Sequence, residues 1–167
     1  MLAHYTRPQS PLGVYVLLML GPRGSASTSP VLGESCGMTL TTGWHDLEVY
    51  GPDWLRWTPD KGEAHVSSDT EQNVILRGLA YAAPRPNTME ITLSGTVIAT
   101  VDLNSGDFQS FPPVTLHLKS GDNVLDFTSK SPAISLPPDT RKLAVALRDL
   151  SLARQDGEEC TVVRNGQ

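Results

Sequence analysis

Apolar and polar residues alternate along most of this chain from about Met38 onward, in short runs that turn residues separate. Because successive side chains of a β-strand point to opposite faces, a period of two is typical of strands with one buried face. The clearest runs are residues 54–58, 73–81, 89–93, 96–101, 114–118, 124–128 and 142–152. Many short strands divided by turns predict an all-β sandwich or barrel.

Two pairs of these runs are predicted to form hairpins. Ser94-Gly95 separates runs 89–93 and 96–101, and glycine readily adopts the positive φ that two-residue turns need. Residues 120–123, Ser-Gly-Asp-Asn, are also turn formers, and we expect them to join 114–118 to 124–128 in a second hairpin.

Residues 142–152 fit two periods. Leu143, Leu147 and Leu150 have helical spacing, and the alanines and arginine of this run favour helices. The run also alternates, and that pattern puts Leu143 and Leu147 on one face and Leu150 on the other. Residues 137–140, Pro-Pro-Asp-Thr, resemble the turns before the other strands, so we expect a strand.

The N-terminal run 12–20 is apolar but shorter than the ~20 residues that cross a membrane as a helix. It fits the apolar part of a signal peptide, the end of a membrane helix, or a buried strand. We place export or membrane attachment ahead of the strand. Residues 25–30 are rich in Ser, Thr and Ala and are expected to form a linker.

The predicted organisation has three parts. Residues 1–37 form a flexible apolar segment and linker, residues 38–153 form the β-domain, and residues 154–167 form a loose polar tail.

The composition and charge of the chain exclude several classes of protein. The chain has 167 residues, a formal net charge of -5, 14 glycines and 13 prolines. An acidic chain without a clustered basic surface is not expected to bind nucleic acid. The composition also excludes collagen, a coiled coil and a polytopic membrane protein.

Cys36 and Cys160 are the two cysteines, and they lie near opposite ends of the predicted domain. The sequence has no zinc-like Cys/His spacing. We expect two unpaired thiols, with a disulfide favoured if the chain faces an oxidising compartment.

Sequence motifs for catalysis are absent: the chain has no GxSxG, HExxH or P-loop. A glycosidase needs two carboxylates across a cleft, and no pair stands out. We expect no cofactor. Calcium is the alternative, because it takes oxygen ligands from loops, and the candidate ligands are Asp102, Asn104, Asp107, Asp122 and Asn123.

Aromatic residues suggest a binding surface. All three tryptophans lie between Trp44 and Trp57, with Tyr50 among them. The apolar C–H faces of sugars stack on aromatic rings. Alternation places Trp54 and Arg56 together, so they are the best candidates for an exposed sugar contact, with burial of Trp54 at an end of the core as an equal alternative. Trp44 and Trp57 are expected to close the ends of the core.

Three segments carry a resemblance to a known family. Residues 43–48 (Gly-Trp-His-Asp-Leu-Glu), 55–58 (Leu-Arg-Trp-Thr) and 139–143 (Asp-Thr-Arg-Lys-Leu) occur in this order. With the similar hairpin 90–103, they make residues 42–152 resemble a β-sandwich module appended to bacterial membrane or cell-envelope glycosyltransferases. The chain departs from that family at Ala144, where glycine is expected, and it contains no transferase domain.

The resemblance implies an all-β, antiparallel jelly-roll-like β-sandwich that catalyses nothing. Its expected partner is a carbohydrate or a glycosyltransferase, and its expected location is the cell envelope or the extracellular space, with the cytoplasm as the alternative. A structural or adhesive envelope domain is the second function, and a small glycoside hydrolase is the third.

The candidate ligand-binding residues are Trp54, Arg56, Tyr50 and Arg141. Asp139 and Arg141 share a face in an extended segment, and an arginine fork binds a carboxylate through two bonds. We therefore expect a structural clamp between them, with a contact from Arg141 to a sugar hydroxyl as the alternative.

Overall fold

The structure is a computed structural model, and it describes residues 36–50 and 53–163, without the side chain of Tyr50. This part of the chain contains β-strands and no helix. The strands are β1 (Cys36–Leu40), β2 (Glu48–Tyr50), β3 (Asp53–Thr58), β4 (Lys61–Ser68), β5 (Gln72–Ala82), β6 (Asn87–Leu93), β7 (Thr96–Leu103), β8 (Gln109–Ser110), β9 (Val114–Leu118), β10 (Gly121–Ser129), β11 (Val145–Arg154) and β12 (Thr161–Val163).

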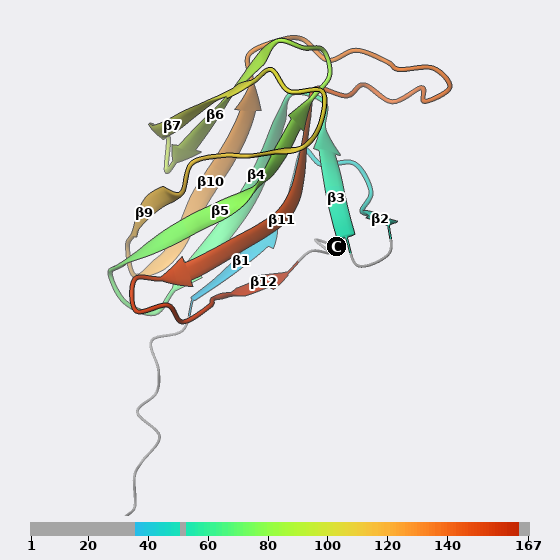
Figure 1. Cartoon of the computed structure of the whole chain (residues 1–167). Helices are drawn as coiled ribbons and strands as arrows, with labels where there is room; N and C mark the ends of the chain where they lie inside the picture. Colours follow the sequence, from blue (N-terminus) through green and yellow to red (C-terminus); the bar gives the residue numbers. More distant parts are fainter. Residues whose placement is uncertain (1–35, 51–52, 164–167) are drawn as a thin grey trace, which may run out of the picture. The chain divides into compact units, whose positions relative to one another are not determined.

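The strands form two sheets that pack face to face (Figure 1). Sheet A has the order β12-β1-β4-β10-β6-β7, and sheet B has the order β2-β3-β11-β5-β8, with β9 also paired to β5. Neighbouring strands are antiparallel except for β1 and β12, which are parallel. The predicted all-β, antiparallel jelly-roll-like sandwich is confirmed.

The inward faces of the two sheets form the apolar core. In β4, the buried Ala64 and Val66 alternate with Glu63 and His65, which point outward. This alternation is the pattern from which the strands were predicted. The largest fully buried side chains of the core include Phe127, Met38, Leu40, Leu76, Met89, Ile91, Leu103, Leu116, Leu118, Leu125, Leu147 and Leu152.

The first predicted hairpin is confirmed as β6 and β7. Ser94 and Gly95 have φ angles of 49° and 82°, and both positive values fit a two-residue turn of the type that joins antiparallel strands.

The second predicted hairpin is wrong. β9 pairs with β5 in sheet B, whereas β10 lies between β4 and β6 in sheet A. Asn123 holds this crossing between the sheets, because its side chain binds the backbone of Lys119 and donates to the carbonyl of Val66. Turn residues reverse the chain, but they do not determine which sheet the next strand joins.

The strand predicted over 142–152 is confirmed as β11, although it begins at Val145. A bulge between Arg148 and Ser151 shifts its register against β5, and Asp149 has a φ of 51°. The bulge adds one residue, so Leu150 faces the core together with Leu147 instead of pointing away from it.

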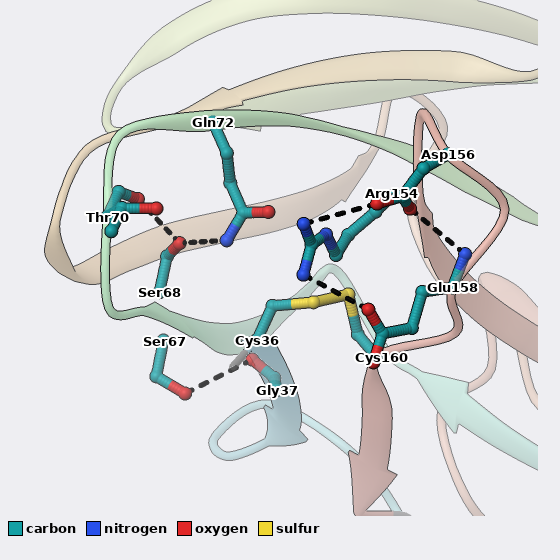
Figure 2. The surroundings of a disulfide bond; sticks show 10 residues. All are labelled: Cys36, Gly37, Ser67, Ser68, Thr70, Gln72, Arg154, Asp156, Glu158 and Cys160. Atoms are coloured by element: carbon teal, nitrogen blue, oxygen red, sulfur yellow. Dashed lines mark hydrogen bonds and ion pairs between the residues drawn. A yellow bond between two sulfur atoms is a disulfide. The ribbon is translucent and has the colours of Figure 1, made fainter. Parts of the chain in front are cut away.

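The prediction of two unpaired cysteines is wrong, because Cys36 and Cys160 form a disulfide (Figure 2). Their Cα atoms lie 5.0 Å apart although 124 positions separate them in the sequence. The parallel pairing of β12 with β1 brings them together, since Gly37 lies opposite Thr161. The expectation of a loose tail therefore fails for residues 160–163.

The apolar run 12–20 and the linker 25–30 lie outside the described residues. Among the residues that are described, no helix is long and apolar enough to cross a membrane.

Candidate functional site

Trp54 lies on the inward face of β3, where 2% of it is exposed, and it belongs to the sandwich core. Of the two alternatives for Trp54, the structural one holds, and the ring is not presented to solvent. Alternation correctly placed Trp54 with Arg56 and opposite Leu55 and Trp57. Both faces of β3 are covered, however, so the sequence pattern did not show which face is internal.

Arg56 is 8% exposed and braces β3 against the loop before β2. Its Nε donates to the carbonyl oxygen of His45 at 3.1 Å. Burial lowers the pKa of Arg56, and the charge of Asp46 partly opposes that shift. Its Nη1 atom is buried and has no partner within the described part of the chain. Arg56 is thus held in the interior and not on a ligand surface.

Trp44 closes the end of the core, as predicted. Its Nε1 donates to the carbonyl of Glu63 at 2.7 Å, and its ring meets Phe127 edge-on with centroids 5.9 Å apart. A side chain at Gly62 would collide with the Trp44 ring, since a Cβ there would lie 2.3 Å from it. Tyr50 ends β2, and its side chain lies outside the described residues.

Arg141 forms the predicted clamp with Asp139. Its Nη2 lies 2.6 Å from Oδ2 of Asp139 and 2.6 Å from Oε1 of Glu48, so it also joins β2 to the segment before β11. Hydrogen bonds from Arg141 lower the pKa of Asp139 to about 2, and the two carboxylates raise the pKa of Arg141. The guanidinium is therefore occupied by two carboxylates of the chain itself.

The segments that carry the family resemblance come together here. Besides the Glu48–Arg141–Asp139 contacts, His45 Nε2 lies 2.8 Å from the carbonyl oxygen of Lys142. Residues from 43–48 and 139–143 thus brace each other, and these motifs position loops in this structure.

The candidate calcium ligands do not form one group. Asp102 lies opposite Thr88 near the start of β6, whereas Asp122 lies opposite Ser67 at the other end of sheet A. Asp122 contacts His65, and Asn123 holds the turn before β10. Within residues 36–50 and 53–163, no group of three or more His, Cys, Asp or Glu residues could hold a metal ion.

A second apolar cluster lies on the outward face of sheet B. Trp57, Ala146 and Tyr81 lie side by side across β3, β11 and β5. The small Ala146 leaves room for the two rings to meet above it, edge-on, with centroids 5.8 Å apart. Ile134 and Leu143, from the segment before β11, pack against this cluster.

Tyr81 joins this cluster to a row of aromatic and cationic groups. The Phe108 ring lies 5.5 Å from the Tyr81 ring, and the guanidinium of Arg85 lies 5.4 Å from the Tyr81 centroid. Arg148 lies over Phe108 at 5.7 Å and pairs with Asp53 and Asp149. Arginine above an aromatic ring is a favourable arrangement, so these contacts hold the rings in place.

A hollow of about 390 Å³ adjoins this row, and we call it the Tyr81 hollow. It is lined by Tyr81, Ala83, Pro84, Arg85, Ile134 and Leu136. Tyr81 is partly exposed in it, and Leu136 is 40% exposed. The volume falls in the range of small-ligand sites, roughly 300–1,000 Å³.

A hollow of about 420 Å³ lies further along β5 and includes Arg77, Phe111 and Asp149 in its lining. Phe111 is 3% exposed there, so its ring presents no face to a ligand. The Tyr81 hollow is the better candidate because it combines an accessible aromatic ring with a guanidinium.

The outward face of sheet A is polar by comparison. Lys61 pairs with Asp126 at 2.9 Å, and His65 lies between Glu63 and Asp122. Such a face is suited to solvent, whereas the outward face of sheet B carries the apolar cluster around Trp57.

Sequence reasoning missed the residues of the Tyr81 hollow. Tyr81 ends the predicted strand 73–81, where apolar residues occupy both faces: Val74 and Leu76 on one, Ile75 and Leu79 on the other. Apolar residues on both faces indicate a strand that is covered on both sides. This pattern was the sequence signal that could have pointed to the hollow. Phe108 and Arg85 follow turns, and no pattern marked them.

No protein-family model matches this sequence, and no curated protein matches it. Among solved structures, the chain is similar to a family 4 carbohydrate-binding module, with 16% identity and a TM-score of 0.45 over 67% of this chain and 77% of that one. It is also similar to a family 35 carbohydrate-binding module from Clostridium thermocellum, with 14% identity and a TM-score of 0.40 over 66% and 95%. A family 29 carbohydrate-binding module variant has 10% identity and a TM-score of 0.40 over 77% and 94%.

Proposed function

We propose that this chain is a non-catalytic carbohydrate-binding module whose ligand lies in the Tyr81 hollow. The observation that carries the proposal is the partly exposed Tyr81 ring in a hollow that also presents Pro84, Leu136 and the Arg85 guanidinium. Sugars offer apolar C–H faces for the ring and aliphatic groups, and hydroxyls for the polar donors. The Tyr81 hydroxyl has no hydrogen-bond partner among the described residues, so it is available to a ligand.

The chemistry of the lining supports binding without catalysis. Glycoside hydrolysis commonly uses two carboxylates that flank the scissile bond, one of them with a raised pKa. The lining of the Tyr81 hollow contains no carboxylate. Asp139 has its pKa lowered to about 2, which is opposite to what a general acid needs.

The proposal includes a cellular location and a partner enzyme. The Cys36–Cys160 disulfide favours an oxidising compartment, such as the cell envelope or the extracellular space. The resemblance of residues 42–152 to modules of envelope glycosyltransferases supports work beside such an enzyme. A pull-down of the envelope fraction with the purified module, followed by identification of any transferase retained, tests that association.

The binding proposal is tested with two substitutions in the hollow. A glycan microarray identifies a bound oligosaccharide, and calorimetry then compares variants. Tyr81→Ala removes the ring and should weaken binding by at least about tenfold, or about 1.4 kcal/mol. Leu136→Ala changes an exposed side chain of the same hollow, so it tests the site without disturbing the Trp57 cluster.

Val97→Ala is the matched control, because Val97 is a 53% exposed apolar residue on sheet A. Its binding should equal that of the unmodified protein. Full affinity in both Tyr81→Ala and Leu136→Ala, or loss of affinity in Val97→Ala alone, would place the ligand elsewhere and refute the proposed site.

A further inference from the structure

Arg85 differs from the other arginines around the Tyr81–Phe108 row in its lack of a carboxylate partner. Arg141 is paired with Asp139 and Glu48, and Arg148 is paired with Asp53 and Asp149. Within the described residues, no carboxylate lies within ion-pair distance of Arg85. Its charge is therefore not neutralised by a carboxylate of residues 36–50 or 53–163.

Local contacts hold this guanidinium at the hollow. It lies over the Tyr81 ring at 5.4 Å, and its Nη1 donates to the carbonyl oxygen of Ser105 at 3.2 Å. Arginine has five N–H donors in a planar fork, and a single carbonyl contact leaves most of them available. An incoming group meets a cation whose position is already restricted, which lowers the entropic cost of binding.

The charge of the lining also favours an anion. Arg85 is the one ionised side chain among the six residues that line the Tyr81 hollow. The other hollow, by contrast, places Asp149 in the same lining as Arg77. A negative group entering beside Arg77 would meet a carboxylate of the lining, whereas the residues that line the hollow beside Arg85 include no carboxylate.

We infer that the sugar bound in the Tyr81 hollow carries a carboxylate, as a uronic acid does, and that this carboxylate lies against Arg85. This inference rests on the proposed function. A carboxylate accepts two parallel hydrogen bonds from a guanidinium, a geometry that a neutral hydroxymethyl group does not match. The Tyr81 ring, Pro84 and Leu136 contact the apolar part of the same sugar.

The test compares polyuronates with neutral polymers of the same linkage. Polygalacturonate, alginate and glucuronan oligomers are titrated into the full chain beside their carboxyl-reduced forms, in which each carboxylate has become a hydroxymethyl group. At least one polyuronate should bind at least about tenfold more tightly than its reduced form, and high salt should weaken that binding. Arg85→Gln should lower the affinity for the polyuronate to that of the reduced form.

Arg77→Gln is the matched control, since Arg77 lies on the outward face of β5 with Tyr81 but lines the other hollow. It should leave the preference unchanged. Equal affinity for the two forms, tighter binding of a sulfated galactan, or an unchanged preference in Arg85→Gln would overturn the carboxylate inference. If Leu136→Ala or Tyr81→Ala weakens the binding of a sugar in those cases, the proposed function stands. No binding to either form or on a glycan microarray refutes the proposed function itself.

Discussion

At the scale of single residues, His65 shows how the polar face of sheet A is organised. Its Nδ1 lies 2.5 Å from Oδ2 of Asp122, and its Nε2 lies 3.3 Å from Oε1 of Glu63. The hydrogen bond to Asp122 raises the pKa of His65 above its usual 6.5, and the second carboxylate adds to that effect. Protonated His65 thus links β4 to β10.

The raised pKa predicts a pH dependence of stability. Because folding raises the pKa of His65, protonation favours the folded state below the unfolded value of 6.5, and this contribution is lost as the pH rises through the folded value. Asp122→Asn should lower the pKa of His65 and flatten this dependence. Titration of the His65 ring protons by nuclear magnetic resonance measures the shift, with His117 on β9 as the internal reference. A His65 pKa that is the same in both proteins contradicts the prediction.

Trp54 and Arg56 mark the limit of prediction at this scale. Alternation was enough to predict that Trp54 and Arg56 share a face, because the side-chain directions in a strand depend only on neighbouring residues. Their burial depends on sheet A and on the loop before β2, which touch β3 only in the folded chain. The Asp139–Arg141 clamp was predictable for the opposite reason, since the two residues are neighbours in sequence.

At the scale of elements, the β6–β7 hairpin depends on the backbone of its turn. Gly95 has a φ of 82°, and a Cβ there would meet nothing within 4 Å. The cost of a side chain is therefore conformational. Gly95→Ala should destabilise the fold by roughly 1–2 kcal/mol, the penalty of the left-handed region.

Urea unfolding measures this effect, and Gly95→Asn is the matched variant, because asparagine tolerates positive φ better than alanine does. The stability should fall in the order glycine, asparagine, alanine. An alanine variant as stable as the unmodified protein would show that the turn relaxes at no cost.

The turn before β10 and the bulge in β11 show why other elements were mispredicted. The turn at residues 94–95 and the turn at residues 120–123 are both rich in glycine and polar residues. The first forms the β6–β7 hairpin, whereas the second carries the chain from one sheet to the other. The bulge at Asp149 moves Leu150 to the core face. Sequence periodicity assumes an unbroken strand, so an inserted residue reverses every later face assignment.

At the scale of the whole molecule, the Cys36–Cys160 disulfide ties the first described strand to the last. A cross-link closing a loop of more than 100 residues should stabilise the fold by roughly 5 kcal/mol in the chain-entropy model. The double variant Cys36→Ser, Cys160→Ser should keep its β-sandwich circular dichroism but unfold at markedly lower urea concentration.

Thiol titration of the unfolded protein, with and without reductant, is the control that shows the bond in the unmodified chain. Reduction should lower its stability to that of the double variant and leave the variant unchanged. A variant as stable as the oxidised protein would show that the pairing of β12 with β1 needs no covalent support.

The all-β class, most strand positions, the β6–β7 hairpin and the Asp139–Arg141 clamp were predictable from the amino-acid order, because each depends on side-chain alternation or on neighbours within a few residues. The burial of Trp54, the pairing of the cysteines and the Tyr81 hollow were not predictable in this way. These depend on which strands become neighbours: β12 reaches β1 across the length of the domain, and Trp57 meets Tyr81 only when β11 lies between their strands. Such contacts join residues far apart in sequence, so no local pattern specifies them.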